Sequence, residues 1–172
     1  MNTRNVMAAL VLLAGAALAG TAPATATTAT EAGPETAPRA APSQVRAFAS
    51  KVTGGLLSES RGILHTKGTD DWILFSPPGA PQGVYQLQVR GTTDCIEAFD
   101  PPLVGVEPCA DNPGKSQRWK LNARIGSATT IESREYPGYF LTPVVQDGKV
   151  ELVPEDDADI EDPRIWTVLR AR

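Results

Sequence analysis

The sequence predicts an all-β domain made of three repeated units. Short runs rich in β-branched and aromatic residues recur between residues 62 and 169, and clusters of Gly, Pro, Asn and Asp separate them. Three tryptophans, Trp72, Trp119 and Trp166, stand 47 residues apart. The sequence around each one is similar: "DDWIL", "QRWKL" and "RIWTV". Many short strands with regular turns indicate a sandwich or a barrel, and the repeat favours three similar units closing on one another.

The expected strands alternate with clear turn signals along the chain. "QDGK", with Asp147 and Gly148 between two alternating runs, is typical of a β-hairpin turn. One segment, Ser43 to Val52 ("SQVRAFASKV"), is expected to be a weak helix. Strands are predicted at Gly62–Thr66, Asp71–Phe75, Val84–Val89, Cys95–Phe99, Val104–Pro108, Arg118–Leu121, Ala128–Ser133, Tyr139–Val145, Lys149–Val153 and Ile165–Leu169.

The second and third units match in the order of their parts. Aligned on tryptophan, each reads as strand, loop, strand, turn, strand, loop and Trp-containing strand. A unit of this kind cannot bury its apolar face alone, so neighbouring units must share a core. Three lobes of roughly 40 residues therefore predict a β-trefoil with pseudo-threefold symmetry and a core that contains the three tryptophans. The first lobe, about residues 44–75, is degenerate and is placed by Trp72 and "GILHT".

Residues 1–26 are expected to be a secretory signal peptide. Arg4 precedes an apolar run, and "ATA" at Ala24 to Ala26 fits a cleavage site between small residues. The apolar run is too short for a retained membrane span. Residues 27–43 are rich in Ala, Thr and Pro and lack large apolar side chains, which is typical of a disordered linker. The folded domain is then residues 44–172 of a secreted, extracellular protein.

The charge of the chain excludes one class of partner. The net charge is −4, and removal of Arg4 with the signal peptide gives about −5. Seven acidic residues lie between Glu151 and Asp162, where a solvated loop is expected because the spacing of a calcium-binding loop is missing. Lysine and arginine are not clustered, so nucleic acid is not an expected partner. No metal or other cofactor is predicted.

The two cysteines, Cys95 and Cys109, are expected to form a disulfide in an exported chain. Closing a loop of this size contributes about 3 kcal/mol in the chain-entropy model. No histidine or third cysteine stands nearby, which disfavours a metal site or a reactive thiol. Both cysteines precede Trp119, and this order disfavours an immunoglobulin-like sandwich, which places its tryptophan between them.

The stretch "DCIEAFDPPLVGVEPCADNPGKSQRWKL" resembles a repeat of the ricin-type (ricin B-like) β-trefoil lectins. That repeat reads Cys-Leu-Asp, then Gly-x-x-Val-x-Leu-x-x-Cys, then Asn-x-x-Gln-x-Trp. The second lobe matches this pattern well and the third lobe matches it loosely. The matching residues of the second lobe are Cys95, Ile96, Gly105, Val106, Cys109, Gln117, Arg118 and Trp119.

The resemblance implies a non-catalytic protein that binds carbohydrate. In such a site a carboxylate and an amide bind paired sugar hydroxyls, and an aromatic ring packs on the sugar's C–H groups. Glu97 takes the position of the family's Asp, and the amide role falls to Asn112 and Gln117. Phe99 is the aromatic residue nearby. Two alternatives stay open: Glu97 as a solvated strand residue, and Gln117 as a support for its own lobe's turn.

The other two lobes depart from the family's pattern. Thr142 replaces the carboxylate in the third lobe, and Arg164 stands at the position that matches Gln117. In the first lobe Asp70 takes that position. At most one lobe is therefore expected to keep most of a sugar site.

Two further functions compete with sugar binding. A β-trefoil protease inhibitor would present a rigid loop to its target, and the Pro-rich segments Phe75–Gly83 and Phe99–Gly105 are the candidate loops, with Leu103 as a contact residue. An enzyme is not expected, because His65 is the sole histidine and lies in a predicted strand. The sequence also contains no serine motif of the nucleophile-elbow type. The sequence thus predicts a monomer that binds a glycan or, alternatively, a protease or other protein.

Overall fold

The computed structural model describes residues 43–157 and 162–172. The predicted signal peptide lies outside these residues, as does the predicted linker up to residue 42. Among the residues described, no helix has the length and apolar character that crossing a membrane requires. The elements there are strands, apart from two short 3₁₀ helices, Lys115–Gln117 (η1) and Glu155–Asp157 (η2).

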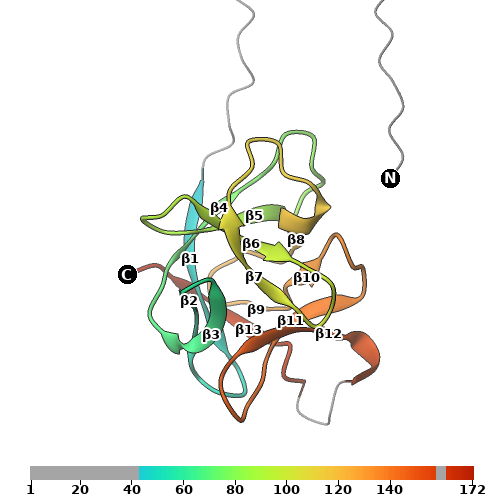
Figure 1. The fold of residues 1–172 in the computed structure, drawn as a ribbon. Coiled ribbons are helices and arrows are strands. Elements are labelled where there is room, and N and C mark those ends of the chain that lie inside the picture. The colour runs from blue at the N-terminus through green and yellow to red at the C-terminus, as the bar shows by residue number, and fades with distance from the viewer. Residues whose placement is uncertain (1–42, 158–161) are drawn as a thin grey trace, which may run out of the picture. The chain divides into compact units, whose positions relative to one another are not determined.

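Seven strands form the antiparallel barrel of the domain (Figure 1). They are β1 (Gln44–Ser50), β4 (Trp72–Phe75), β5 (Val84–Val89), β8 (Trp119–Lys120), β9 (Ala128–Thr129), β10 (Glu132–Ser133) and β13 (Trp166–Arg170). β1 pairs with β13 and β4, β4 pairs with β5, and β5 pairs with β8. β8 pairs with β10 and β13 pairs with β9, and β9 and β10 follow one another along the chain with two residues between them.

Three β-hairpins pack against one another outside the barrel ring. They are β2 (Leu56–Ser60) with β3 (Ile63–Gly68), β6 (Asp94–Ala98) with β7 (Val104–Pro108), and β11 (Tyr139–Pro143) with β12 (Val150–Pro154). Each hairpin contacts the other two, which is the arrangement of the predicted β-trefoil. The joining contacts are Ile63 paired with Gly105, His65 bridged to Lys149, and Leu152 N donating to Pro102 O at 2.9 Å.

The three tryptophans make the same contact in each lobe. Each is 0% exposed, and each indole Nε1 donates to the carbonyl of a fully buried aliphatic residue in the first strand of its own hairpin. The spacing of 47 residues therefore reflects three equivalent places in the fold. The hydrogen bonds join Trp72 to Leu57 at 2.9 Å, Trp119 to Ile96 at 3.0 Å and Trp166 to Leu141 at 2.9 Å.

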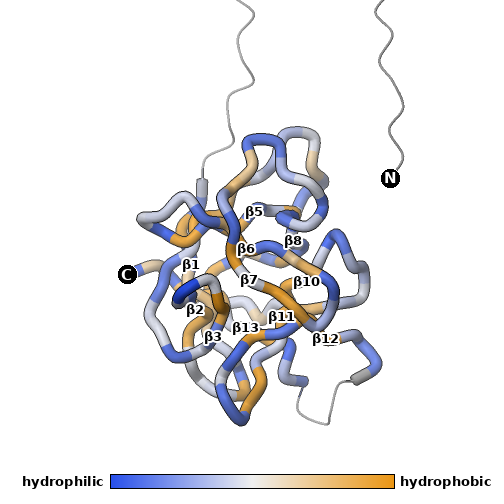
Figure 2. The backbone as a smooth tube through the Cα atoms, in the orientation of Figure 1, coloured by the Kyte–Doolittle hydropathy of each residue, from blue (hydrophilic) through white to orange (hydrophobic). Residues whose placement is uncertain are grey.

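One apolar cluster joins all three lobes. Besides the tryptophans it contains fully buried aliphatic side chains from every hairpin, which no lobe could cover alone. Figure 2 shows the same division along the backbone, with hydrophobic segments in the strands and mostly hydrophilic segments in the loops. Members at 0% or 1% exposure include Phe48, Leu57, Leu64, Leu74, Leu87, Ile96, Ile131, Leu141 and Leu152.

The first lobe differs from its sequence-based prediction. The weak helix predicted at residues 43–52 is wrong, because residues 44–50 form strand β1. β1 pairs with two neighbours, β13 and β4, and buries Ala47 and Phe48 in the core. These contacts outweigh a small helix propensity. The strand at Leu56–Ser60 was not predicted, since "LLSES" lacks the β-branched and aromatic residues that mark strands.

Candidate functional site

The second lobe holds one carboxylate in a fixed outward orientation. Glu97 lies in β6 and is half-buried. Its Oε1 accepts a hydrogen bond from Ser116 Oγ at 3.0 Å, and its Oε2 accepts one from Gln117 Nε2 at 2.7 Å. Both donors belong to the segment of η1, immediately before the Trp119 strand. A carboxylate offers about four lone-pair positions, so about two remain for a ligand.

Gln117 uses its whole hydrogen-bonding capacity inside the protein. The side chain is 5% exposed. Its Nε2 donates to Glu97 and to Pro108 O at 3.0 Å, and its Oε1 accepts from Ala110 N at 3.0 Å and Gln86 Nε2 at 2.8 Å. A side-chain amide has two donors and two acceptor positions, and all four are occupied. Gln117 therefore orients Glu97 and supports its own loop, and it has no group left to contact a sugar.

Phe99 supplies an apolar surface close to Glu97 along the chain. It follows Glu97 by two residues, directly after the end of β6, and it is 37% exposed. Its ring lies beside Gly105, where a Cβ atom would come within 3.3 Å of the ring carbon Cε2. The absence of a side chain at Gly105 thus gives the ring its place.

Ser116, and not the predicted Asn112, lies beside Glu97. Asn112 is exposed, and no hydrogen bond joins it to Glu97 or Gln117 among the described residues. Ser116 contacts Glu97 directly, although it was not among the predicted site residues. The available signal was its position next to Gln117, because a residue adjacent to an orienting amide shares its short helix.

The predicted disulfide is confirmed between Cys95 and Cys109, whose Cα atoms are 4.9 Å apart. Cys95 lies in β6, two residues before Glu97, and Cys109 directly follows β7. Cys109 N also donates to Thr93 O at 2.8 Å. Ser116 and Gln117 lie in the loop that begins at Cys109. These bonds attach the start of that loop to β6, the strand that contains Glu97.

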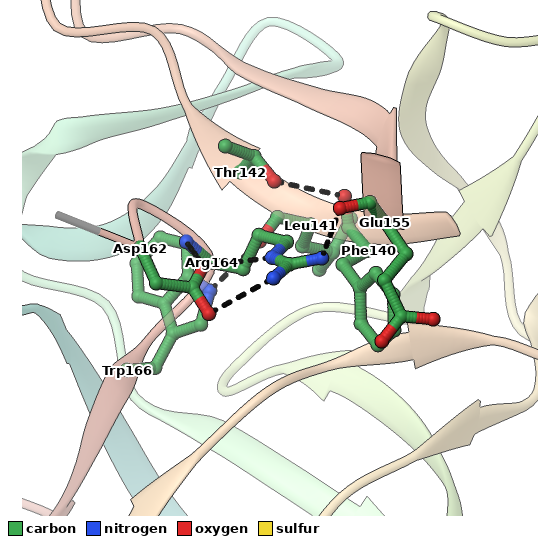
Figure 3. Close-up of polar contacts among 7 residues, drawn as sticks. All are labelled: Phe140, Leu141, Thr142, Glu155, Asp162, Arg164 and Trp166. Atoms are coloured by element: carbon green, nitrogen blue, oxygen red, sulfur yellow. Dashed lines mark hydrogen bonds and ion pairs between the residues drawn. The ribbon is translucent and has the colours of Figure 1, made fainter. Parts of the chain in front are cut away.

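The matching position in the third lobe is filled by an ion pair (Figure 3). Arg164 donates from Nε to Asp162 Oδ1 at 2.7 Å and from Nη2 to Asp162 Oδ2 at 3.0 Å. Its Nη1 donates to Glu155 O at 3.0 Å, and the guanidinium lies 5.2 Å from the centre of the Phe140 ring. The hydrogen bonds to Arg164 lower the pKa of Asp162, and the same bonds raise the pKa of Arg164. Thr142 is buried and donates to Phe140 O, so no carboxylate faces outward from this hairpin position.

The first lobe also uses its matching residues internally. Ser58 is 0% exposed, and its hydroxyl accepts a hydrogen bond from Asp70 N at 3.3 Å. Asp70 Oδ2 accepts from Glu59 N at 2.7 Å. The His65 side chain also bonds within its own lobe, since its Nδ1 accepts a hydrogen bond from Lys67 N at 3.0 Å. At these matching positions, and within residues 43–157 and 162–172, the second lobe alone therefore combines an oriented carboxylate with an exposed ring.

Comparison with known proteins identifies the fold. No family profile matches the chain, and no curated protein matches it. Among solved structures, the designed threefold-symmetric protein ThreeFoil superposes with a TM-score of 0.52 at 18% identity, covering 73% of this chain and 97% of that one. The fold is a β-trefoil.

Natural proteins share this β-trefoil architecture at similarly low identity. The Haemophilus ducreyi cytolethal distending toxin gives a TM-score of 0.58 at 16% identity over 74% of this chain and 84% of that one. A chicken IL-1 hydrophobic cavity mutant gives 0.57 at 17% identity over 76% of this chain and 98% of that one. A toxin and a cytokine on one fold show that the architecture leaves function to surface sites.

Proposed function

We propose that this protein is a secreted, non-catalytic carbohydrate-binding β-trefoil with its working site on the second lobe. The observation that carries the proposal is the Glu97 carboxylate, which Ser116 and Gln117 hold from one side while Phe99 stands exposed two residues away. A polar group oriented in advance, beside an apolar surface, is the usual composition of a small-ligand site. The ricin-type pattern of the second lobe supports the same function.

The proposed binding uses two kinds of contact. The free lone pairs of Glu97 accept hydrogen bonds from neighbouring hydroxyls of one sugar ring. The exposed part of Phe99 packs on the C–H groups of the ring. Because Ser116 and Gln117 already hold the carboxylate, little side-chain entropy is lost on binding.

A glycan-array screen tests the proposal with three forms of the purified protein. Wild type is expected to bind at least one neutral glycan, and Glu97→Ala is expected to lose that binding. Glu107→Gln, which removes an exposed carboxylate from the neighbouring strand β7, serves as the charge-matched control and is expected to bind like wild type. Equal binding by wild type and Glu97→Ala would reject a site at Glu97.

A protein partner is the second candidate, and an exposed apolar surface favours it. Ile63 is 51% exposed and Leu103 is 62% exposed, and both border a cavity where the hairpins meet. Substrate-like protease inhibition through Leu103 is less well supported. Leu103 O accepts from Phe99 N at 3.2 Å and Leu103 N donates to Asp100 O at 3.0 Å, so its backbone is engaged within the loop.

Assays against secreted serine and cysteine proteases separate the two candidates. Inhibition that Leu103→Ser abolishes and Glu97→Ala leaves intact would favour the protein partner. Glycan binding that Glu97→Ala abolishes and Leu103→Ser leaves intact would favour the carbohydrate.

A further inference from the structure

A cavity that Glu97 does not line lies close to the Glu97 site. Its volume is about 320 Å³, and it lies between the Pro-rich β4–β5 connection and the loop that follows the disulfide. Gln117 separates the two places, because one end of its amide contacts Glu97 and the other end contacts Gln86, which lines the cavity. Neither the lectin pattern nor the Glu97 site accounts for this cavity.

Gln86 provides an unused acceptor. The side chain is 7% exposed, and its Nε2 donates to Ala110 O at 3.2 Å and to Gln117 Oε1 at 2.8 Å. No residue that the structure describes donates to its Oε1. Every fully buried side-chain nitrogen or oxygen in that part of the chain has a partner, so this oxygen must be accessible from outside. The cavity that Gln86 lines is the place where it is accessible.

The other free polar groups of the cavity are mostly acceptors as well. Gln88 donates from Nε2 to Thr92 O at 2.6 Å, which leaves its Oε1 available. Asp111 is exposed and forms neither an ion pair nor a hydrogen bond with the residues described. Apolar walls come from Phe75 and from the buried ring of Pro77. The cavity thus combines amide oxygens, one carboxylate and apolar surface, with the hydroxyl of Ser76 at its edge.

This composition selects for a ligand that donates and carries positive charge. An ammonium group has donors and no acceptor, so it matches amide oxygens and a carboxylate without leaving a group unpaired. A carboxylated sugar would be repelled by Asp111, and a neutral hydroxyl would gain less from it. An aromatic ring in the wall adds attraction for a cation.

We infer that this cavity binds the protonated amine of an amino sugar, with the sugar ring against Phe75 and Pro77. The inference rests on the proposed carbohydrate-binding function and names a substrate class for a second subsite of the same lobe.

The test is an NMR titration of the ¹⁵N-labelled protein with glucosamine at a pH where its amine is protonated, beside glucose as the neutral control. Glucosamine is expected to shift the side-chain amide signals of Gln86 and Gln88 and the backbone signals of Ala110 and Asp111, to saturation. Glucose is expected to shift them much less. Asp111→Asn is expected to weaken glucosamine binding about three- to fivefold, the range of an exposed ion pair, while Glu107→Gln leaves it unchanged.

Two results would overturn the inference: equal shifts with glucose and glucosamine, or equal glucosamine affinity in wild type and Asp111→Asn. The variant Glu97→Gln distinguishes this inference from the proposed function. It is expected to keep the glucosamine shifts at the cavity and to lose neutral-glycan binding. Loss of neutral-glycan binding with unchanged glucosamine shifts would therefore bear on the Glu97 site alone. Absence of glucosamine shifts at Gln86 and Gln88 in the wild type would reject the cavity as an amine site.

Discussion

The second and third lobes place different side chains at the same two positions of the fold. Glu97 and Gln117 occupy these positions in the second lobe, and Thr142 and Arg164 occupy them in the third. Gln117 both donates and accepts, so it completes the bonds of its loop and also orients a carboxylate that faces outward. Arg164 can only donate, so it requires Asp162 and a backbone carbonyl as partners.

The difference teaches that the residue two before the tryptophan decides whether a carboxylate of its lobe is held by a neutral amide or paired with a guanidinium. A neutral amide leaves the outward carboxylate free of a permanent counter-ion. A guanidinium at the same place recruits its own carboxylate, and the pair occupies the space beside the hairpin (Figure 3). The two lobes share a scaffold and differ in whether their charges are already neutralised.

The largest expected effect comes from the covalent bond that the second lobe has and the third lacks. Cys95→Ala is expected to lower the free energy of unfolding by about 3 kcal/mol, because the open loop gains entropy in the unfolded chain. Thermal unfolding measures the change, and the near-ultraviolet signal of the buried tryptophans is expected to show that the fold persists. Wild-type protein treated with a reductant is the control and should behave like the variant. An unchanged melting temperature in both would contradict a stabilising role.

A smaller effect compares the same substitution at the two matching positions. Gln117→Met is expected to cost about 2 to 3 kcal/mol, because it removes the acceptor of Ala110 N and one of the two hydrogen bonds of the buried Gln86 amide. Arg164→Met is expected to cost about 1 kcal/mol, since Asp162 is one-third exposed and can be solvated. Denaturant unfolding of both variants measures the difference. Equal costs would mean that Gln117 is no more central to its lobe than Arg164 is.

The smallest effect is the pH dependence of the third-lobe ion pair. The pKa of Asp162 is lowered in the folded protein, chiefly by hydrogen bonds from Arg164. The stabilisation is therefore complete above the unfolded-state pKa of about 3.9 and is lost as the pH falls through the lower folded-state pKa. Wild type is expected to melt above Asp162→Asn at pH 6, and the gap is expected to narrow below about pH 4.

The control for this pH series is Glu107→Gln, which removes an exposed carboxylate of the second lobe. Its melting temperature is expected to stay parallel to that of wild type. A constant gap between wild type and Asp162→Asn across the series would show that the ion pair contributes nothing that depends on charge.

The sequence predicted the repeated parts of the fold because repetition is visible in one chain. Equal tryptophan spacing and matching strand order were enough for the trefoil, and two cysteines in a short loop were enough for the disulfide. β2 was missed because "LLSES" lacks the residues that mark strands, and β1 was missed because its pairing partners are distant. Ala49, for example, pairs with Thr167 at the other end of the domain, and no local pattern records this.

The residue types of the candidate site could be read from the sequence, but their contacts could not. Glu97 and Gln117 were singled out from the pattern, but the four hydrogen bonds that occupy Gln117 depend on backbone groups such as Pro108 O and Ala110 N. The second cavity depends on Gln86, which is 31 residues from Gln117 in the chain. Neither motif nor composition gives the direction of such a side chain.

The repeated indole bond has a consequence for how this domain can change over time. Each tryptophan secures its hairpin from inside the barrel, through a backbone carbonyl that every amino acid possesses. The residue that follows this carbonyl is a serine, a glutamate or a threonine in the three lobes, and all three hairpins still form. The backbone carbonyl that holds each hairpin and the side chain that differs between the lobes are therefore separate groups. A lobe can lose, alter or acquire specificity by substitution at its surface while the neighbouring lobes go on holding it in place.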